Sequence, residues 1–419
     1  MHAVNTVKTF CQASGSAVNW DKCIGFWHGE WDVTPRVFLN IKWQETQVMY
    51  LGVPLEFCHD SEPYWKKETQ ALRNDVEKWK GWGISIFARA TTCNLFLVSK
   101  LWYVMQVWHC SRISVQKIHR VFAIFIWSSV WERSSRTNLF RKVRDGGFGL
   151  VHLYIRQLVN RFLFLRDVDD PFLRTVIQLR LSRVLPGFIV SSSNMQGPIQ
   201  GYLKEVVSSF RFLSVRFSLE YLAEVPRKKL YRDLVDVLLP VPLYRQLYCA
   251  GPGQDVLKRV KRMLVAPGVR TFFFKLHTGT LPVKTWLQDK GIFEPWSTNC
   301  HLCNKPETIE HVFIDCWSGV FFWDILQRTL KKELPLRPHG IRFLSVKNEA
   351  VVPYDLIMLL GLHSIWKTRC AFENADVEVL AVRQYFCKSV CHFLEMLKSQ
   401  EDVPDWIGRI KRLLRMPKY

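Results

Sequence analysis

Four potential metal ligands lie close together in the sequence at Cys300, Cys303, His311 and Cys316, spaced as C-x2-C-x7-H-x4-C. Two thiolates separated by two residues can hold one metal ion from a tight turn, and a His and a third Cys on the next segment complete a tetrahedron. Three sulfurs and one imidazole are typical of structural zinc, because they fill all four positions and leave none for a reactive water. The spacing therefore predicts a zinc-stapled module. The alternative is three buried thiols and a surface His without a metal.

The residues between the first and last of these ligands predict a structural metal that does not itself contact a polyanion. Lys305 is the only Lys or Arg in this stretch, whereas Glu307, Glu310 and Asp315 make it acidic. Glu310 and Asp315 are candidates for orienting the ligands through hydrogen bonds. His301 is an alternative imidazole ligand, although it lies too close in sequence to the second cysteine for easy joint chelation.

The composition indicates a folded protein with a polyanionic partner. The chain has 419 residues, 48% of them hydrophobic, which is enough for roughly two to four domains. Lys and Arg total 58 against 37 Asp and Glu, a formal net charge of +21. Such an excess favours nucleic acid as the partner, with an anionic membrane surface second and mere solubility as the plain alternative. The 17 Trp and 28 Phe must include many core residues, and others could stack on unpaired bases.

The remaining cysteines and the hydropathy pattern indicate a soluble protein in a reducing compartment. Scattered single cysteines read as free thiols; they are Cys11, Cys23, Cys58, Cys93, Cys110 and Cys249. Cys387, Cys391 and His392 share a predicted helix, but no fourth ligand is evident, and we interpret the two cysteines as buried thiols. No signal peptide opens the chain, and Arg89 and Lys100 interrupt its most apolar stretch, 84–108. We expect an intracellular protein, nuclear or cytoplasmic, that is not secreted and does not bind membranes.

Hydrophobic periodicity predicts a chain that is mostly helical after a short strand-rich start. Strands are expected over 17–26, 38–43 and 47–53. The segment 169–200 is poorly patterned and rich in Pro and Ser, and we interpret it as a boundary. Helices are expected over 2–13, 64–79, 84–110, 115–131, 153–166, most of 201–247, 270–277 and 354–398.

Five short motifs follow one another in an order that identifies a family. They are S-G-x-x-x-N-x-x-K at 14–22, Tyr50-Leu51-Gly52-Val53, D-G-G-F-G-L at 145–150, the Cys/His module at 300–316 and, more weakly, I-W-K-T-R at 365–369. Each motif except the Cys/His module is weak alone. Together they resemble the C-terminal half of a non-LTR (LINE-type) retrotransposon reverse transcriptase. The resemblance covers nearly the whole chain and implies the end of a palm, a thumb, a linker and a CCHC zinc knuckle.

The resemblance implies roles for residues near the primer terminus. Lys22 occupies the place of a lysine near the leaving pyrophosphate, where an ammonium can neutralise charge or donate a proton. The alternative is a solvated lysine at a strand end. Tyr50, Leu51 and Gly52 would form the primer grip, where a glycine lets the backbone approach nucleic acid closely. The alternative is a plain edge strand that ends in a turn.

The resemblance also implies phosphate contacts from the thumb helices. Arg89, Lys100, Arg112 and Lys117 are the candidates for binding a template–primer duplex. For each of them a solvated helix face is an equally good interpretation.

The family's polymerase chemistry needs carboxylates that hold Mg²⁺ against the triphosphate and the primer hydroxyl. Its Asp-Asp hairpin lies upstream of the segment that matches 14–22. The only Asp-Asp pair here, Asp169-Asp170, lies after the thumb signature and beside Pro171, so we interpret it as a loop. We therefore expect no polymerase activity from this chain alone, and Mg²⁺ binding only if a complete palm is supplied.

The expected fold class is α+β, mostly α, in five segments: a palm remnant over 1–56, a thumb over 57–168, a helical linker over 169–280, the CCHC module over 281–330 and a helical tail over 331–419. The expected function is binding of RNA, an RNA–DNA hybrid or target DNA by a polymerase fragment with structural Zn²⁺. Two alternatives stay open: a part of a longer or split RNA-directed DNA polymerase, and a zinc-stapled scaffold for protein partners that the sequence does not identify.

Overall fold

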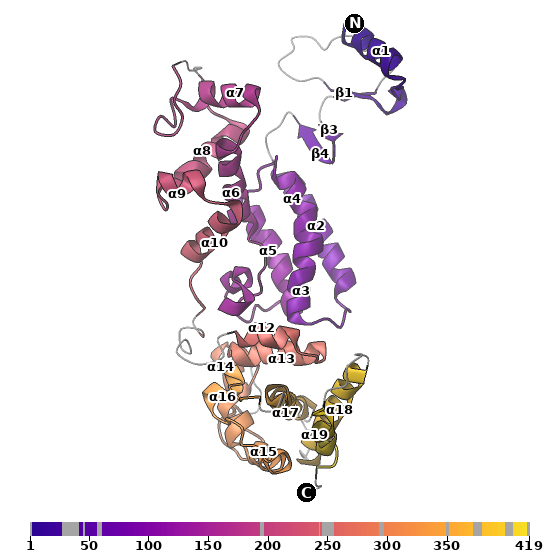
Figure 1. Ribbon diagram of the computed structural model, residues 1–419, viewed down its shortest axis with the longest axis vertical. Coiled ribbons are helices and arrows are strands. Elements are labelled where there is room, and N and C mark those ends of the chain that lie inside the picture. Colours follow the sequence, from indigo (N-terminus) through magenta and orange to yellow (C-terminus); the bar gives the residue numbers. More distant parts are fainter. Residues whose placement is uncertain are drawn as a thin grey trace. The chain divides into compact units, whose positions relative to one another are not determined.

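The computed structural model describes residues 2–26, 42–44, 47–56, 61–192, 197–242, 244, 255–292, 297–348, 352–371, 379–398 and 405–416. Helices predominate in these ranges and the strands are few and short (Figure 1), which confirms the predicted α+β, mostly α, fold class. No helix in these ranges is long and apolar enough to cross a bilayer. The chain forms two compact units: a first unit of residues 1–67, 100–111 and 160–216, and a second unit of residues 68–99, 112–159 and 217–419. The five predicted segments stay predictions.

The first unit contains the strands and the helices nearest to them. α2 (Glu62–Trp79), α4 (Ser99–Met105) and α6 (Leu153–Arg166) contribute residues to both units. The other elements of the first unit are α1 (His2–Ser14), η1 (Trp20–Lys22), β1 (Ile24–Phe26), β2 (Lys42–Gln44), β3 (Gln47–Tyr50), β4 (Val53–Glu56), α7 (Pro171–Leu181) and α8 (Gly201–Ser214).

The strands form two separate pairs. β1 and β2 are parallel, with Ile24 opposite Lys42, and β3 and β4 are antiparallel, with Tyr50 opposite Val53. The single strand predicted over 47–53 is wrong, because Leu51 (φ 48°) and Gly52 (φ 79°) both adopt left-handed backbone and reverse the chain. Two successive positive φ angles are the geometry of a two-residue hairpin turn.

Two other predictions near the first unit also need correction. Within the predicted strand 17–26, a 3-10 turn at Trp20–Lys22 precedes β1, since the Asn19 side chain accepts a hydrogen bond from the Lys22 N–H at 3.2 Å. Part of the predicted strand 38–43 lies outside the described residues. The segment 169–200, in which we found no helical pattern, contains α7, which starts at Pro171 and is capped by the Asp170 side chain, an acceptor for the Leu173 N–H at 2.8 Å. Its role as a boundary stays a prediction.

A buried arginine organises the helical part of the first unit. Arg161 on α6 is only 1% exposed and forms an ion pair with Glu205 of α8 at 2.8 Å. Its other nitrogens donate to the carbonyl oxygens of Gln106 at 2.6 Å and Trp108 at 3.4 Å, just after α4 ends. One guanidinium therefore satisfies carbonyls at a helix C-terminus and a carboxylate, as a buried charge requires.

The second unit is built mainly of helices, and its described residues also include tight turns and the isolated antiparallel bridge of Asn299 with Pro306. Its elements are α3 (Ile86–Thr92), the π-helix η2 (Cys93–Val98), α5 (Arg112–Trp127), η3 (Arg136–Phe140), η4 (Val143–Asp145), α9 (Leu219–Glu224), α10 (Arg227–Leu238), α12 (Val256–Arg262), α13 (Pro267–His277), α14 (Lys284–Asp289), η5 (His311–Asp315), α15 (Trp317–Leu330), α16 (Pro338–Phe343), α17 (Tyr354–Ala371), α18 (Val379–Lys398) and α19 (Ile407–Leu413). The helix predicted over 84–110 is instead three consecutive pieces, α3, η2 and α4, and ends at Met105.

The D-G-G-F-G-L motif forms a tight turn whose glycines are required by geometry. Gly147 lies so close to the preceding chain that an added Cβ would sit 2.2 Å from the Arg141 carbonyl oxygen. The Gly149 N–H donates to the same carbonyl at 2.7 Å, and the Leu150 N–H donates to Leu139 at 2.9 Å. Phe148 is buried at the centre of the turn. In this structure the motif therefore allows close backbone packing and buries the Phe148 side chain.

Consecutive phenylalanines on α13 connect two parts of the second unit's core. Phe274 packs against Phe148 of the glycine turn, with ring centroids 4.3 Å apart, and against Phe87 of α3 at 5.7 Å. Phe272 packs instead against Phe313 of η5 at 5.9 Å and Trp366 of α17 at 6.4 Å. Two residues along a helix differ by about 200° in direction, so α13 is buried on both sides and joins α3 and the glycine turn to the Cys/His segment.

Candidate metal centre

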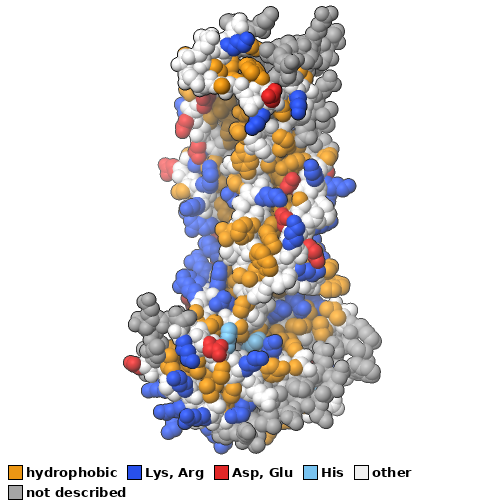
Figure 2. All heavy atoms as spheres, turned by 90° about the vertical axis from the view of Figure 1, so that its right-hand side faces the viewer, with side chains coloured by type: hydrophobic (Ala, Val, Ile, Leu, Met, Phe, Trp, Pro, Cys, Tyr) orange, Lys and Arg blue, Asp and Glu red, His pale blue; other side chains and the backbone are white. Residues whose placement is uncertain are grey.

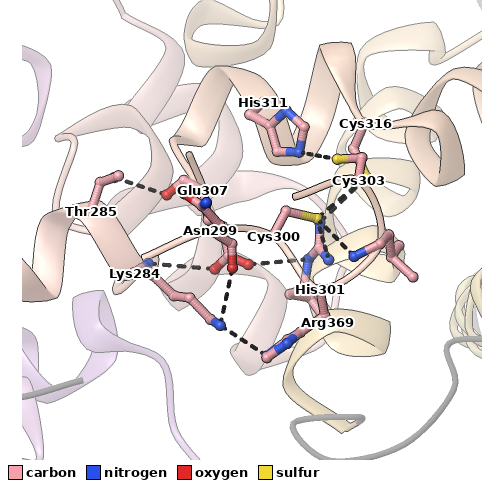
Figure 3. Close-up of polar contacts among 11 residues, drawn as sticks. Lys284, Thr285, Asn299, Cys300, His301, Cys303, Glu307, His311, Cys316 and Arg369 are labelled. Atoms are coloured by element: carbon pink, nitrogen blue, oxygen red, sulfur yellow. Dashed lines mark hydrogen bonds and ion pairs between the residues drawn. The ribbon is translucent and has the colours of Figure 1, made fainter. Parts of the chain in front are cut away.

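The structure brings the four predicted ligands to one place. One ligand atom from each of Cys300, Cys303, His311 and Cys316 lies within 4.8 Å of all the others (Figure 3). The sulfurs of Cys300 and Cys316 are 3.9 Å apart. With Zn–S bonds of about 2.3 Å, two sulfurs at the corners of a zinc tetrahedron lie about 3.8 Å apart. The donor set and this separation both fit zinc.

The first two ligands come from a short hairpin. Asn299 and Pro306 form an antiparallel bridge, and the Cys300 N–H donates to Lys305 at 2.8 Å. Asn304 closes the turn with a φ of 54°, a left-handed conformation that Asn tolerates better than most residues. The Leu302 N–H donates to the Cys300 sulfur at 3.4 Å. This turn places two cysteine sulfurs on the same side of the backbone.

The other two ligands come from a π-helix and the residue after it. His311 opens η5, with its N–H bonded to the Thr308 hydroxyl at 3.0 Å. The Cys316 N–H donates to the His311 carbonyl at 2.8 Å, and Cys316 then serves as the N-cap of α15. Nε2 of His311 faces Cys303, with Nε2 and Sγ 3.0 Å apart. His311 is 4% exposed, Cys300 2% and Cys316 0%, so the centre is largely sealed from water.

The surroundings favour a thiolate at Cys300. The hydrogen bond from Cys316 lowers the pKa of Cys300 most, and His311, the Leu302 N–H and Arg369 also lower it, against burial, which raises it. The guanidinium of Arg369, on α17, donates to the Cys300 sulfur at 3.3 Å and to the Cys316 sulfur at 3.5 Å. A metal ligand must be deprotonated, and these contacts favour that state.

Glu307 and Lys284 support the same centre from the side (Figure 3). The Glu307 carboxylate lies 3.8 Å from Nε of Arg369 and accepts from the Lys284 N–H at 3.4 Å. Burial raises the pKa of Glu307, while the nearby Arg369 opposes that rise. Nζ of Lys284 donates to the Asn299 carbonyl at 3.2 Å and lies 2.8 Å from Nε2 of His301.

The residues that contact the ligands differ from those the sequence suggested for that role. Glu310 forms an ion pair with Arg342 at 2.9 Å, Asp315 is exposed, and His301 lies beside Lys284. Arg369, which lies outside the Cys/His segment, donates to two of its sulfurs. Its only sequence signal is the weak I-W-K-T-R motif, since 53 residues separate Arg369 from Cys316.

The primer-terminus candidates lie in the first unit. Lys22 is exposed at the end of η1. Tyr50 (62% exposed) and Leu51 (71% exposed) form the tip of the β3–β4 hairpin with Gly52, and a Cβ on Gly52 would lie 3.7 Å from the Tyr103 ring. Their nucleic-acid roles stay predictions.

The thumb candidates have different surroundings. Arg89 donates to the carbonyl oxygens of Phe125 at 2.9 Å and Trp82 at 3.3 Å, so its guanidinium already serves the fold of the second unit. Burial lowers its pKa. Arg112 and Lys117, on α5, and Lys100, in the first unit, are exposed. These roles also stay predictions.

The cysteine pair on α18 is not buried as predicted. Cys391 is exposed and Cys387 is half-buried. At a spacing of four residues they share a helix face. Cys391 lines a groove between α18 and α19.

Comparison with known proteins fits this geometry. Residues 242–323 match the family described as zinc-binding in reverse transcriptase. The chain is also 28% identical over 170 residues to an uncharacterized 149 kDa protein of transposon TX1 from Xenopus laevis. The alignment covers 38% of this chain and 13% of that relative's length. The chain contains a reverse-transcriptase-related, zinc-binding region. The predicted resemblance to a non-LTR retrotransposon protein is confirmed for that region.

Proposed function

We propose that this chain is a nucleic-acid-binding part of a reverse-transcriptase-related transposon protein, in which zinc is structural. Its ligands would be RNA, an RNA–DNA hybrid or target DNA. The relationship to reverse transcriptases and the net charge of +21 support a polyanionic ligand. The observation that carries the proposal is a difference in pairing within the second unit. Arg369 and Lys284 beside the metal centre are hydrogen-bonded, whereas four cations that line the groove between α18 and α19 form no ion pair with a described residue.

Cys300, Cys303, His311 and Cys316 are the proposed zinc ligands. Three thiolates and an imidazole fill the four positions of a structural site, so the metal would supply folding free energy and no reactive water. The cations nearest the centre are occupied, because Arg369 contacts the sulfurs and Lys284 contacts the Asn299 carbonyl. Lys305, which is exposed, is the cation between the first and last ligands that these contacts leave for phosphate.

In the groove between α18 and α19, the last two helices, the cations have no such partners among the described residues. A groove of about 600 Å³ lies between α18 and α19 and is lined by four cations and one carboxylate, Glu395. The cations are Lys398, Lys411, Arg412 and Arg415, and none of them forms an ion pair with a described residue. Figure 2 looks onto the side that carries α18 and α19, and Lys and Arg side chains are spread over its lower part with few Asp or Glu.

A second concave site lies on the other face of α18. This cavity, about 220 Å³, is formed by the start of α13, α17 and α18. Its apolar wall includes Phe393, and Tyr385, Lys367 and Lys388 line it as well, without a carboxylate among the lining residues. An aromatic surface beside cations suits an unpaired nucleotide, whose base can stack while its phosphate is neutralised.

Charge reversal on α19 tests the proposal. The triple variant Lys411→Glu, Arg412→Glu, Arg415→Glu changes three exposed side chains and should weaken binding of a fluorescent single-stranded RNA at least about 10-fold. The slope of log affinity against log salt should fall by about 2, since each lost phosphate contact removes about 0.7 on a single strand.

Two control variants locate the effect. Lys228→Glu with Arg232→Glu alters exposed cations on α10, and Lys305→Glu alters the only cation between the first and last metal ligands. Both should leave RNA affinity within about 2-fold of the parent, apart from the general charge effect seen at low salt. Unchanged affinity in the α19 variant, or equal losses in all three, would refute the α18–α19 surface as the binding site. Salt-insensitive capture of a protein without RNA would favour the scaffold alternative.

A part of a longer or split RNA-directed DNA polymerase is the second candidate, favoured by a relative of which the alignment covers 13%. Mapping the 5′ end of the transcript and reading the frame upstream of Met1 tests it. An in-frame Asp-Asp hairpin would support Mg²⁺-dependent synthesis, with Lys22 and Tyr50 beside the primer. A transcript that begins at Met1 would count against it.

A further inference from the structure

We propose that Arg369 belongs to the zinc centre as the positioning residue for its thiolates, and that through it zinc ties helix α17 to the Cys/His segment. The inference rests on the proposed zinc ligation. It extends the centre beyond the matched region, which ends at residue 323, to a side chain on a different helix.

The two terminal nitrogens of the Arg369 guanidinium each approach a different cysteine sulfur. One terminal nitrogen of Arg369 lies 3.3 Å from the Cys300 sulfur and the other lies 3.5 Å from the Cys316 sulfur. The two sulfurs are 3.9 Å apart, so one planar guanidinium can donate to both at once. A lysine ammonium is a point charge on a flexible stem and cannot reproduce this paired contact.

The contact between Arg369 and the two sulfurs compensates the net charge of the proposed zinc centre. Zn²⁺ with three thiolates and a neutral imidazole carries one net negative charge. The sulfurs of Cys300 and Cys316 belong to residues that are 2% and 0% exposed, and an uncompensated charge in such a place is costly. The Arg369 side chain, 12% exposed, supplies one positive charge at hydrogen-bonding distance. Glu307, 3.8 Å from Nε, fixes the remaining side of the guanidinium.

Packing holds α17 in the place that this contact requires. Gly361 meets the Trp323 ring of α15 so closely that an added Cβ would sit 2.8 Å from it. Five residues further along α17, the Trp366 ring stacks on Phe272 of α13, with ring centroids 6.4 Å apart. In Figure 1, α17 lies among α13, α15 and α18. Arg369 is thus carried on a buried helix and is not a surface side chain that reaches the sulfurs by chance.

The consequence is a coupling between zinc and the last helices. Lys367, two residues before Arg369 and therefore on another face of α17, lines the cavity shared with α18. Zinc-bound thiolates would hold the C-terminal end of α17 through Arg369 and so keep Lys367 in register with α18. Loss of zinc should loosen α17 before it affects the glycine turn at 145–150.

The test measures zinc affinity of the full chain by competition with a chromogenic chelator at constant pH. Arg369→Gln should weaken zinc binding about 10- to 100-fold, the usual range for partners of metal ligands. Arg369→Lys keeps the charge and should fall between this variant and the parent. Lys367→Gln, on the same helix but away from the sulfurs, is the matched control and should bind zinc like the parent.

Two further readouts distinguish this role from a general loss of folding. In the Co²⁺-substituted protein, Arg369→Lys should shift the thiolate-to-metal charge-transfer bands, because hydrogen bonds to the sulfurs change. Hydrogen exchange should show that zinc protects α17 in the parent and less in the variant. Parent-like zinc affinity and spectra in both Arg369 variants would overturn the inference while leaving zinc ligation intact. A parent chain that holds no zinc would overturn both.

Discussion

Two tight segments of the second unit reverse the chain by different means. The turn at 145–150 relies on its own backbone: Gly147 admits the Arg141 carbonyl where a side chain could not fit, and Phe148 fills an aromatic core. The segment at 300–316 is formed by side chains that converge on one point, with a π-helix and a short hairpin around them. The first is specified by steric limits on residues close in sequence. In our proposal, the second is held by a metal and by a charge from a distant helix.

The largest expected effect separates the two segments by their need for metal. Cys303→Ser should abolish zinc binding and remove hydrogen-exchange protection from η5 and α15, because structural zinc contributes on the order of 10–16 kcal/mol to small zinc modules. The turn at 145–150 should keep most of its protection. Metal analysis with hydrogen exchange reads both effects.

The control for this variant is Cys391→Ser, an exposed thiol outside the cluster, which should retain the parent zinc content. Unchanged zinc stoichiometry in Cys303→Ser would contradict the ligand assignment. Equal loss of protection in both segments would erase the distinction between them.

A smaller effect is expected from the glycine turn. Gly147→Ala places a methyl group 2.2 Å from a backbone oxygen and should lower the free energy of unfolding by about 2–4 kcal/mol. Gly149→Ala meets no atom within 4 Å, and its φ of 70° should cost only about 1–2 kcal/mol. Urea denaturation of zinc-saturated protein measures both. A Gly149 variant as unstable as the Gly147 variant would show that backbone conformation, not the close approach, governs the turn.

The smallest effect concerns two histidines near the glycine turn. The Leu153 N–H donates to Nε2 of His119 and the Ile155 N–H donates to Nδ1 of His152, each at 3.3 Å, so both rings act as acceptors at these nitrogens. Burial lowers the pKa of His119, with His152 and Arg136 adding to it. Burial lowers the pKa of His152 to about 4, and Arg112 adds to that.

A lowered histidine pKa makes acid destabilising. Between pH 6.5 and 4 the unfolded chain binds more protons than the folded chain, so stability is lost as the pH falls through that window. For His152 the loss at pH 5.5 should be about 1 kcal/mol. Urea midpoints from pH 7 to 5.5, compared with those of His152→Asn, isolate this part from proton uptake at the zinc ligands. If the urea midpoint of His152→Asn falls with decreasing pH as steeply as that of the parent, the lowered pKa of His152 does not cause the acid destabilisation.

Sequence patterns predicted the elements that depend on local chemistry. The helix at 153–166 has the predicted bounds, because its apolar residues repeat at helical spacing. The spacing of the four ligands predicted a cluster that the structure forms, since tight turns leave little freedom between them. Sequence patterns gave the wrong element where the backbone conformation departs from the preference of the residue. Leu51 is compatible with a strand but has a positive φ, and a π-helix interrupts the long helix predicted over 84–110.

The charges around the metal centre lay beyond prediction for a different reason. Glu310 and Asp315 are close to the ligands in sequence, yet Glu310 pairs with Arg342 and Asp315 faces solvent. Which carboxylate or guanidinium faces a sulfur depends on helix packing, and a pattern of neighbours does not contain that information.

By itself, the sequence determined a mostly helical, strongly basic protein with a Cys₃His cluster and a reverse-transcriptase-related order of motifs. These features follow from residue types, periodicity and short spacings. Only the tertiary structure decided that Arg369 faces Cys300 and Cys316, and that four cations without an ion pair to a described residue line the groove between α18 and α19. Both depend on contacts between segments far apart in the chain, and those contacts are selected by burial of apolar surface and by compensation of buried charge across the whole unit.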